Sequence, residues 1–159
     1  MDILPRIVRR ADGQALCTTE YSAAGWLRPT WQGYVTLADA EQGALAALEP
    51  LRIGKVPYLL NDNSQLKDPW FDSLDWLKRV WAPQATQLGL RFVAHVVQPH
   101  TEADLEGTLT HNPFAGLFEL QLFSTVGQAA AWLHECQHQA GRHSATDAAI
   151  PPADQSAPA

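Results

Sequence analysis

The sequence is poor in basic residues and in cysteine. Its 159 residues contain 11 Lys and Arg against 17 Asp and Glu, which gives a net charge of -6. Nucleic acids and anionic membrane surfaces are bound by clustered positive charge, and the Arg9-Arg10 pair is too short to supply it. Cys17 and Cys136 form no CxxC pair and are typical of a reducing compartment. We therefore expect no nucleic-acid partner and no disulfide scaffold.

Long apolar runs are also missing. No segment approaches the ~18 apolar residues of a membrane span, and the first six residues lack the apolar run of a signal peptide. We therefore expect a cytoplasmic protein without a membrane span. Apolar residues still make up 46% of the chain. A chain of this length forms one soluble domain, with a core that needs neither disulfides nor a metal.

The order of secondary structure follows from the spacing of apolar residues and from turn signals. Strand patterns and helix patterns alternate after a first pair of strands, and residues 1–140 contain no linker. The predicted strands are Ala15–Tyr21, Trp26–Trp31, Val56–Leu60, Arg91–Val97 and Gly116–Phe123. The predicted helices are 36–54 with Thr36 as its N-cap, 68–88 with an interruption at Pro83 and a stop at Leu88–Gly89, Thr101–Leu109, and 125–140. We expect residues 141–159, rich in Ala and Pro, to form a disordered tail.

This order predicts an α/β fold. Two strands joined by a short turn form an N-terminal hairpin, and the later alternation implies right-handed crossovers between parallel strands. We expect a single mixed, mostly parallel sheet of about five strands, covered by about four helices.

Short stretches spread over residues 15–135 carry a family resemblance. They are Tyr21–Trp31 with Gly33, Leu59–Asn63, Trp76–Leu77 with Trp81 and Pro83, Gly89–Arg91 with Ala94, and Phe123 with Ala129 and Trp132–Leu133. In these stretches the chain resembles the small bacterial STAS-like proteins, which are relatives of the anti-sigma-factor antagonists. The resemblance implies a STAS-like fold, and it implies far less about function because these motifs carry no known chemistry.

The resemblance also implies a candidate switch. Anti-sigma-factor antagonists are phosphorylated on a Ser or Thr that opens the helix after a central strand, and Ser64 is the hydroxyl in the corresponding turn. The chain departs from this pattern because Gln65–Lys67 precede the expected helix start at Asp68. The alternative interpretation is that Asn61, Asp62 and Asn63 shape the turn and cap its backbone.

A ligand site is a further interpretation of the same turn. Ligands of open parallel sheets bind beyond the carboxyl ends of the strands. Strands that end at Leu60 and Val97 would bring Asn61–Ser64 close to Gln98 and His100. A satisfied histidine on a sheet face is the preferred interpretation of His95.

The sharpest chemical motif is the HExxH string, in which His134 and His138 are candidate zinc ligands and Glu135 is the candidate base. His143 could supply a third ligand. However, the string lacks the downstream Met-containing turn of metzincins, since Met1 is the only Met. Helical geometry also places His134 and His138 about 80° and 120° from the apolar stripe, towards the flank or the solvent. We therefore keep a zinc hydrolase as the alternative function.

The preferred function is a regulatory or binding module without catalysis or cofactor. We expect it to act through a protein partner or a small apolar ligand, with a homodimer as one form of the protein contact. Trp76 is a candidate contact residue because it lies about 120° from Trp70 on the same helix, so that one helix face cannot bury both.

Overall fold

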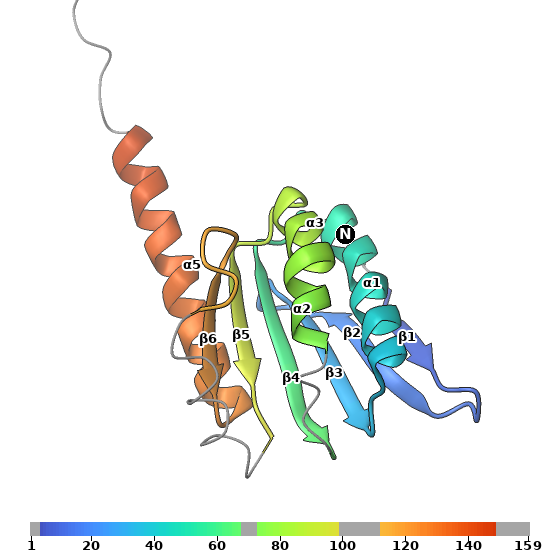
Figure 1. The fold of residues 1–159 in the computed structure, drawn as a ribbon. Helices are drawn as coiled ribbons and strands as arrows, with labels where there is room; N and C mark the ends of the chain where they lie inside the picture. Colours follow the sequence, from blue (N-terminus) through green and yellow to red (C-terminus); the bar gives the residue numbers. More distant parts are fainter. Residues whose placement is uncertain (1–3, 68–72, 99–111, 149–159) are drawn as a thin grey trace, which may run out of the picture.

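The computed structural model describes residues 4–67, 73–98 and 112–148, and of residues 143–148 it describes only the backbone. Trp70, His100 and the predicted helix Thr101–Leu109 lie outside the described residues. The helices pack against a single β-sheet (Figure 1). The predicted α/β class is therefore confirmed.

In the described part of the chain, the six strands of the sheet lie in the order of the sequence. They are β1 (Arg6–Arg9), β2 (Ala15–Tyr21), β3 (Leu27–Gly33), β4 (Tyr58–Leu66), β5 (Phe92–Val96) and β6 (Glu119–Phe123). β1, β2 and β3 pair antiparallel, whereas β3, β4, β5 and β6 pair parallel. The sheet is mixed and contains the predicted hairpin as β2 and β3. The predicted count of about five omitted β1, which pairs with β2 at the edge.

The described residues form three helical stretches. The first is α1 (Leu37–Gly54); the second joins α2 (Leu74–Trp76), a π-helical turn (Leu77–Trp81) and α3 (Ala82–Gln87); the third is α5 (Val126–Ala148). None of the helices in the described ranges combines the length and the apolar character that a membrane crossing needs.

The helices pack on opposite faces of the sheet, with α1, α2 and α3 in front of it in Figure 1. Leu59 of β4 belongs to one core cluster with residues of α1 and α3, whereas the next residue, Leu60, packs with Leu133 of α5. Successive side chains of a strand point to opposite faces. We call these faces the α1/α3 face and the α5 face.

Local signals in the sequence fix the ends of α1. Thr36 is the N-cap, as predicted, and its hydroxyl accepts from the backbone N–H of Asp39 while the Asp39 carboxylate accepts from the backbone N–H of Thr36. This reciprocal pair is a capping box. At the other end the helix closes on Lys55, in the left-handed conformation with φ 47°.

β4 is longer than predicted, and this corrects the sequence interpretation. Asn61–Ser64 do not form a turn after Leu60, because β4 continues through them to Leu66. The strand pairs with β3 from Leu59 to Leu66 and with β5 from Tyr58 to Asp62. This pairing outweighs the weak intrinsic preference of Asn, Asp and Ser for turns.

Pro83 does not interrupt its helix, contrary to the prediction. The preceding turn is π-helical, and the backbone N–H of Ala82 bonds the carbonyl of Leu77, five residues back. The helix therefore changes its bonding pattern just where the proline removes a donor. The side-chain amide of Gln84 donates to the carbonyl of Val80 at 2.9 Å, and the helix ends at the predicted Leu88–Gly89 stop.

α5 also extends further than predicted. The helix continues past Ala140 to Ala148, into the segment for which we expected a disordered tail. Residues 149–159 lie outside the described residues.

Candidate functional site

The four candidate residues of β4 lie on two faces of the sheet. Asn61 and Asn63 point to the α1/α3 face. On this face Asn61 contacts Trp31 of β3. The ring of Trp31 lies so close to α1 that a Cβ added to Gly43 would meet it. Asp62 points to the α5 face with its register partner Thr30. The sequence predicted one cluster in a turn, whereas the structure separates it into two sites.

Trp31, Asn61, Asn63 and His95 form the first site, which we call the amide–imidazole network. The indole Nε1–H of Trp31 donates to Oδ1 of Asn61 at 3.0 Å, and Nδ2 of Asn61 donates to Oδ1 of Asn63 at 3.0 Å. His95 is the register partner of Asn61 in the parallel β4–β5 pair. Its Nδ1 lies 2.8 Å from Nδ2 of Asn61, and its Nε2 lies 3.5 Å from Nδ2 of Asn63.

Burial keeps the imidazole of this network neutral. Loss of hydration lowers the pKa of His95 to about 4, and the nearby charge of Asp62 only partly opposes this effect. Asn61 and Asn63 are 9% and 2% exposed. The network therefore consists of neutral donors and acceptors at neutral pH.

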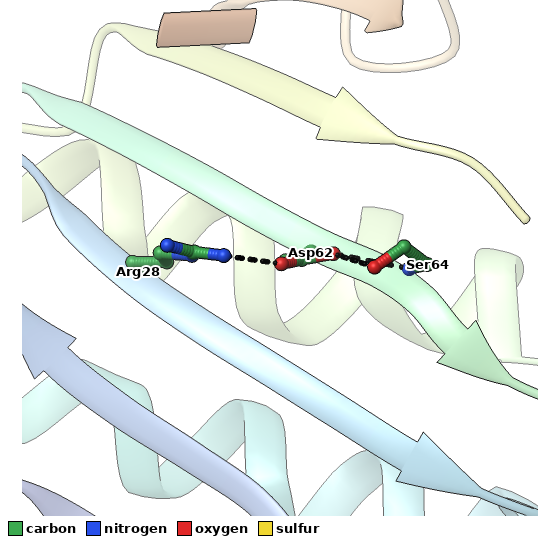
Figure 2. Close-up of polar contacts among 3 residues, drawn as sticks. All are labelled: Arg28, Asp62 and Ser64. Atoms are coloured by element: carbon green, nitrogen blue, oxygen red, sulfur yellow. Dashed lines mark hydrogen bonds and ion pairs between the residues drawn. The ribbon is translucent and has the colours of Figure 1, made fainter. Parts of the chain in front are cut away.

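Arg28, Asp62 and Ser64 form the second site, which we call the charged cluster and which Figure 2 shows. Nη2 of Arg28 donates to Oδ2 of Asp62 at 2.7 Å. Both the hydroxyl and the backbone N–H of Ser64 donate to Oδ1 of Asp62, at 2.6 and 3.1 Å. The Asp62 side chain is 1% exposed, whereas that of Arg28 is 39% exposed.

These contacts keep Asp62 ionised. Burial raises the pKa of its carboxyl, but the hydrogen bonds from Ser64 and Arg28 together lower it further, so that the pKa lies below its ordinary value. The Nε of Arg28 is buried and has no partner among the described residues. The cluster is a charge pair supported by one hydroxyl.

The remaining residues of the predicted site are more scattered. Gln98, two residues beyond the end of β5, is buried, and His100 lies outside the described residues. Trp76 is partly buried and packs against the core cluster on the α1/α3 face. Ser64 lies within β4 and does not open a helix.

The histidines of the HExxH string lie on the outer side of α5, as the helical geometry predicted. His134, Glu135 and His138 are exposed, and the side chain of His143 is outside the described part. The ring of His134 packs edge-on against Trp26 with centroids 4.9 Å apart, and its Nδ1 lies 3.2 Å from Oε1 of Gln137. Within the described residues, no three His, Cys, Asp or Glu side chains are placed to share a metal ion.

A small groove of about 230 Å³ lies between α5 and the amino ends of β5 and β6. It is lined by Phe92, Glu119, Trp132, Glu135, Cys136, Gln139 and Ala140. Burial raises the pKa of the Cys136 thiol, and the charges of Glu119 and Glu135 raise it further. The groove combines aromatic rings with two carboxylates, so it is less apolar than the expected ligand would require.

The chain matches no protein-family model, no curated protein and no solved structure.

The sequence did not identify three residues of these sites. Trp31 belonged to the predicted hairpin, Arg28 carried no motif, and His95 was interpreted as a satisfied histidine on a sheet face. The signal that was present is the spacing of Asn61 and Asn63, because residues two apart share one face of a strand. That spacing becomes informative only once the segment is known to be a strand.

Proposed function

We propose that the protein is a STAS-like binding or regulatory module that acts by contact with a protein partner or a small, largely apolar ligand. In this proposal it performs no reaction of its own. The observation that supports it best is the neutral character of the amide–imidazole network. A general base works best with a pKa near the working pH, and the pKa of His95 is about 4. His95 is therefore better suited to hydrogen-bond recognition than to proton transfer at neutral pH.

The position of the network supports the same proposal. Ligands of parallel sheets bind near the carboxyl ends of strands. His95 is the last residue but one of β5, and Trp31 lies two residues before the end of β3. The network therefore lies near the carboxyl ends of β3 and β5, where such ligands bind.

A second copy of the chain is one proposed form of the protein contact. Leu4, just before the edge strand β1, and Ile7, within that strand, are exposed. Exposed apolar side chains at a sheet edge favour pairing with another chain.

Native mass spectrometry of protein purified without an affinity tag tests the proposal. We expect a retained small molecule or a second protein chain, and we expect the retained mass to decrease in Asn63→Leu, which removes an amide but keeps the branched shape of the side chain. Circular dichroism would verify that the variant is folded. A bare monomer in both proteins would contradict the proposal.

The competing zinc hydrolase uses His134, His138 and His143 as ligands and Glu135 as the base. Metal analysis of the same preparation separates the two functions, since a catalytic zinc requires stoichiometric metal held by protein ligands. Stoichiometric zinc that is lost in His134→Ala would overturn the binding-module proposal. The phosphorylation-switched antagonist is tested separately, by mapping phosphate on Ser64 after incubation with cell extract.

A further inference from the structure

The amide–imidazole network brings two hydrogen-bond donors into contact with each other. The orientation of its first amide, that of Asn61, is fixed by Trp31. An indole N–H can only donate. The atom of Asn61 that lies 3.0 Å from Trp31 Nε1 must therefore be the oxygen Oδ1. This contact sets the orientation of the Asn61 amide and leaves Nδ2 to face the rest of the network.

The amide nitrogen of Asn61 then determines which nitrogen of His95 carries the proton. Nδ2 of Asn61 is a donor, and it lies 2.8 Å from Nδ1 of His95. Nδ1 must accept this bond and carries no hydrogen. In the neutral ring the proton is therefore on Nε2.

The remaining contact brings two donors together. Nε2–H of His95 faces Nδ2 of Asn63 at 3.5 Å. Nδ2 of Asn61 lies 3.0 Å from Oδ1 of Asn63. If the Asn63 amide were turned over, Oδ1 would face His95, but Nδ2 of Asn63 would then face Nδ2 of Asn61. One donor-to-donor contact remains in either orientation, and Asn63 is only 2% exposed.

We propose that Nε2–H of His95 and Nδ2 of Asn63 together bind one oxygen acceptor of a ligand, the oxygen of a carbonyl or carboxylate group. The inference rests on the proposed binding function and specifies the chemistry of its ligand. One oxygen can accept hydrogen bonds from both nitrogens through its two lone pairs. It would satisfy both donors that the described residues leave unmatched.

A water molecule fits this position less well. Buried waters typically make about three hydrogen bonds, and a water here would accept two and then need acceptors for its own hydrogens. Both contacts that the described residues offer at this point are donors. A carbonyl or carboxylate oxygen carries no hydrogens that need acceptors, so it matches the donor pair better.

NMR of the full chain with acetate and acetamide as probes tests the inference. Imidazole ¹⁵N shifts of His95 report the tautomer, and we expect Nε2 to carry the proton. We expect either probe to shift the ring of His95 and the side-chain amide of Asn63 in a saturable way. Acetate binding would raise the pKa of His95 and acetamide binding would not, so the two arms distinguish a carboxylate ligand from a neutral carbonyl.

Matched controls make the test specific. Asn63→Leu should weaken probe binding by about five- to tenfold, the effect of losing one hydrogen bond. His134 is an internal control because its ring is exposed on α5, outside the network. Ethylammonium, which can only donate, should not shift His95.

Three results would overturn the inference. They are a proton on Nδ1 of His95, equal shifts with ethylammonium, and no saturable shift with acetate or acetamide, which would mean that water alone occupies the position. If native mass spectrometry still shows a retained partner that depends on Asn63, the binding function stands and only the acceptor chemistry fails.

Discussion

The two faces of β4 hold polar side chains within the sheet in different ways. On the α5 face, Asp62 is charged and accepts from Arg28 and Ser64. On the α1/α3 face, Asn61, Asn63 and His95 are neutral and leave a donor pair unmatched. The charged face leaves one donor without a partner among the described residues, the buried Nε of Arg28. The neutral face leaves two donors only 3.5 Å apart, which one acceptor can satisfy together. The neutral face is therefore the better candidate for a ligand.

Acid should affect the two faces in different pH ranges, and His95 should give the largest effect. Its pKa is about 4 in the folded protein, against an ordinary value of 6.5. Between these values the unfolded chain binds a proton that the native protein does not. The free energy of unfolding should therefore fall as the pH drops from about 6.5 to 4, by up to about 3 kcal/mol.

Urea unfolding at a series of pH values checks this expectation. In His95→Gln the loss of stability over this range should be smaller, because the titrating group is gone. Equal pH dependence in both proteins would mean that burial does not shift the pKa of His95. The stabilisation from Asp62 is lost only at lower pH, since its pKa lies below the ordinary value of 3.8.

Gly43→Ala should disturb the neutral face through Trp31. A Cβ at position 43 would clash with Cη2 of Trp31, and the hydrogen bond to Asn61 restrains the indole from moving away. Overpacking of this kind costs about 1–3 kcal/mol. Thermal unfolding measures the effect.

Gly127→Ala is the matched control on α5. The nearest atom to its added Cβ would be Oγ1 of Thr125 at 3.9 Å, so the alanine has room. Because Ala favours a helix over Gly, we expect a gain of up to about 1 kcal/mol. A loss of stability at position 127 equal to that at position 43 would contradict the role given to Trp31.

Arg28→Met should disturb the charged face by a smaller amount. It leaves Asp62 buried with Ser64 as its remaining side-chain donor. Because Arg28 is 39% exposed, solvent screens the pair, and we expect a loss of about 1–2 kcal/mol at pH 7. The difference from the wild type should shrink in acid as Asp62 becomes protonated.

Arg52→Met is the corresponding control, because Arg52 pairs with Glu49 on the surface of α1. An exposed pair of this kind contributes little to the free energy of unfolding because solvent screens it, so we expect a smaller loss than in Arg28→Met. Urea unfolding of both variants decides the comparison, and an equal loss at positions 28 and 52 would place the charged cluster among ordinary surface pairs.

The sequence predicted those parts of the fold that local patterns determine. The cap at Thr36, the hairpin of β2 and β3, and the stop at Leu88–Gly89 depend on neighbouring residues, and all three are present. The course of β4 through Asn61–Ser64 depends on two flanking strands that are distant in sequence. Single-sequence reasoning weighs the turn preference of these residues and does not include the ladders that outweigh it.

The candidate site followed from the sequence only in part. Asn61, Asp62, Asn63 and Ser64 were identified as polar residues near a strand end, but their separation onto two faces was not predicted. Their partners Trp31 and Arg28 lie about 30 residues earlier. Such pairings depend on the register between strands, which no local motif specifies.

The strand order has a consequence for folding kinetics. Each strand of the sheet pairs with the strand that precedes it in the chain, from β1 to β6. The antiparallel pairs join residues 6 to 14 apart in the sequence, whereas the parallel pairs join residues 27 to 34 apart. The antiparallel pairs have shorter loops to close, so they should form first. A ribosome releases the chain from its amino end, so the sheet can grow strand by strand during synthesis. The antiparallel hairpin of β2 and β3 would then form first, and the parallel strands β4, β5 and β6 would add to it in turn.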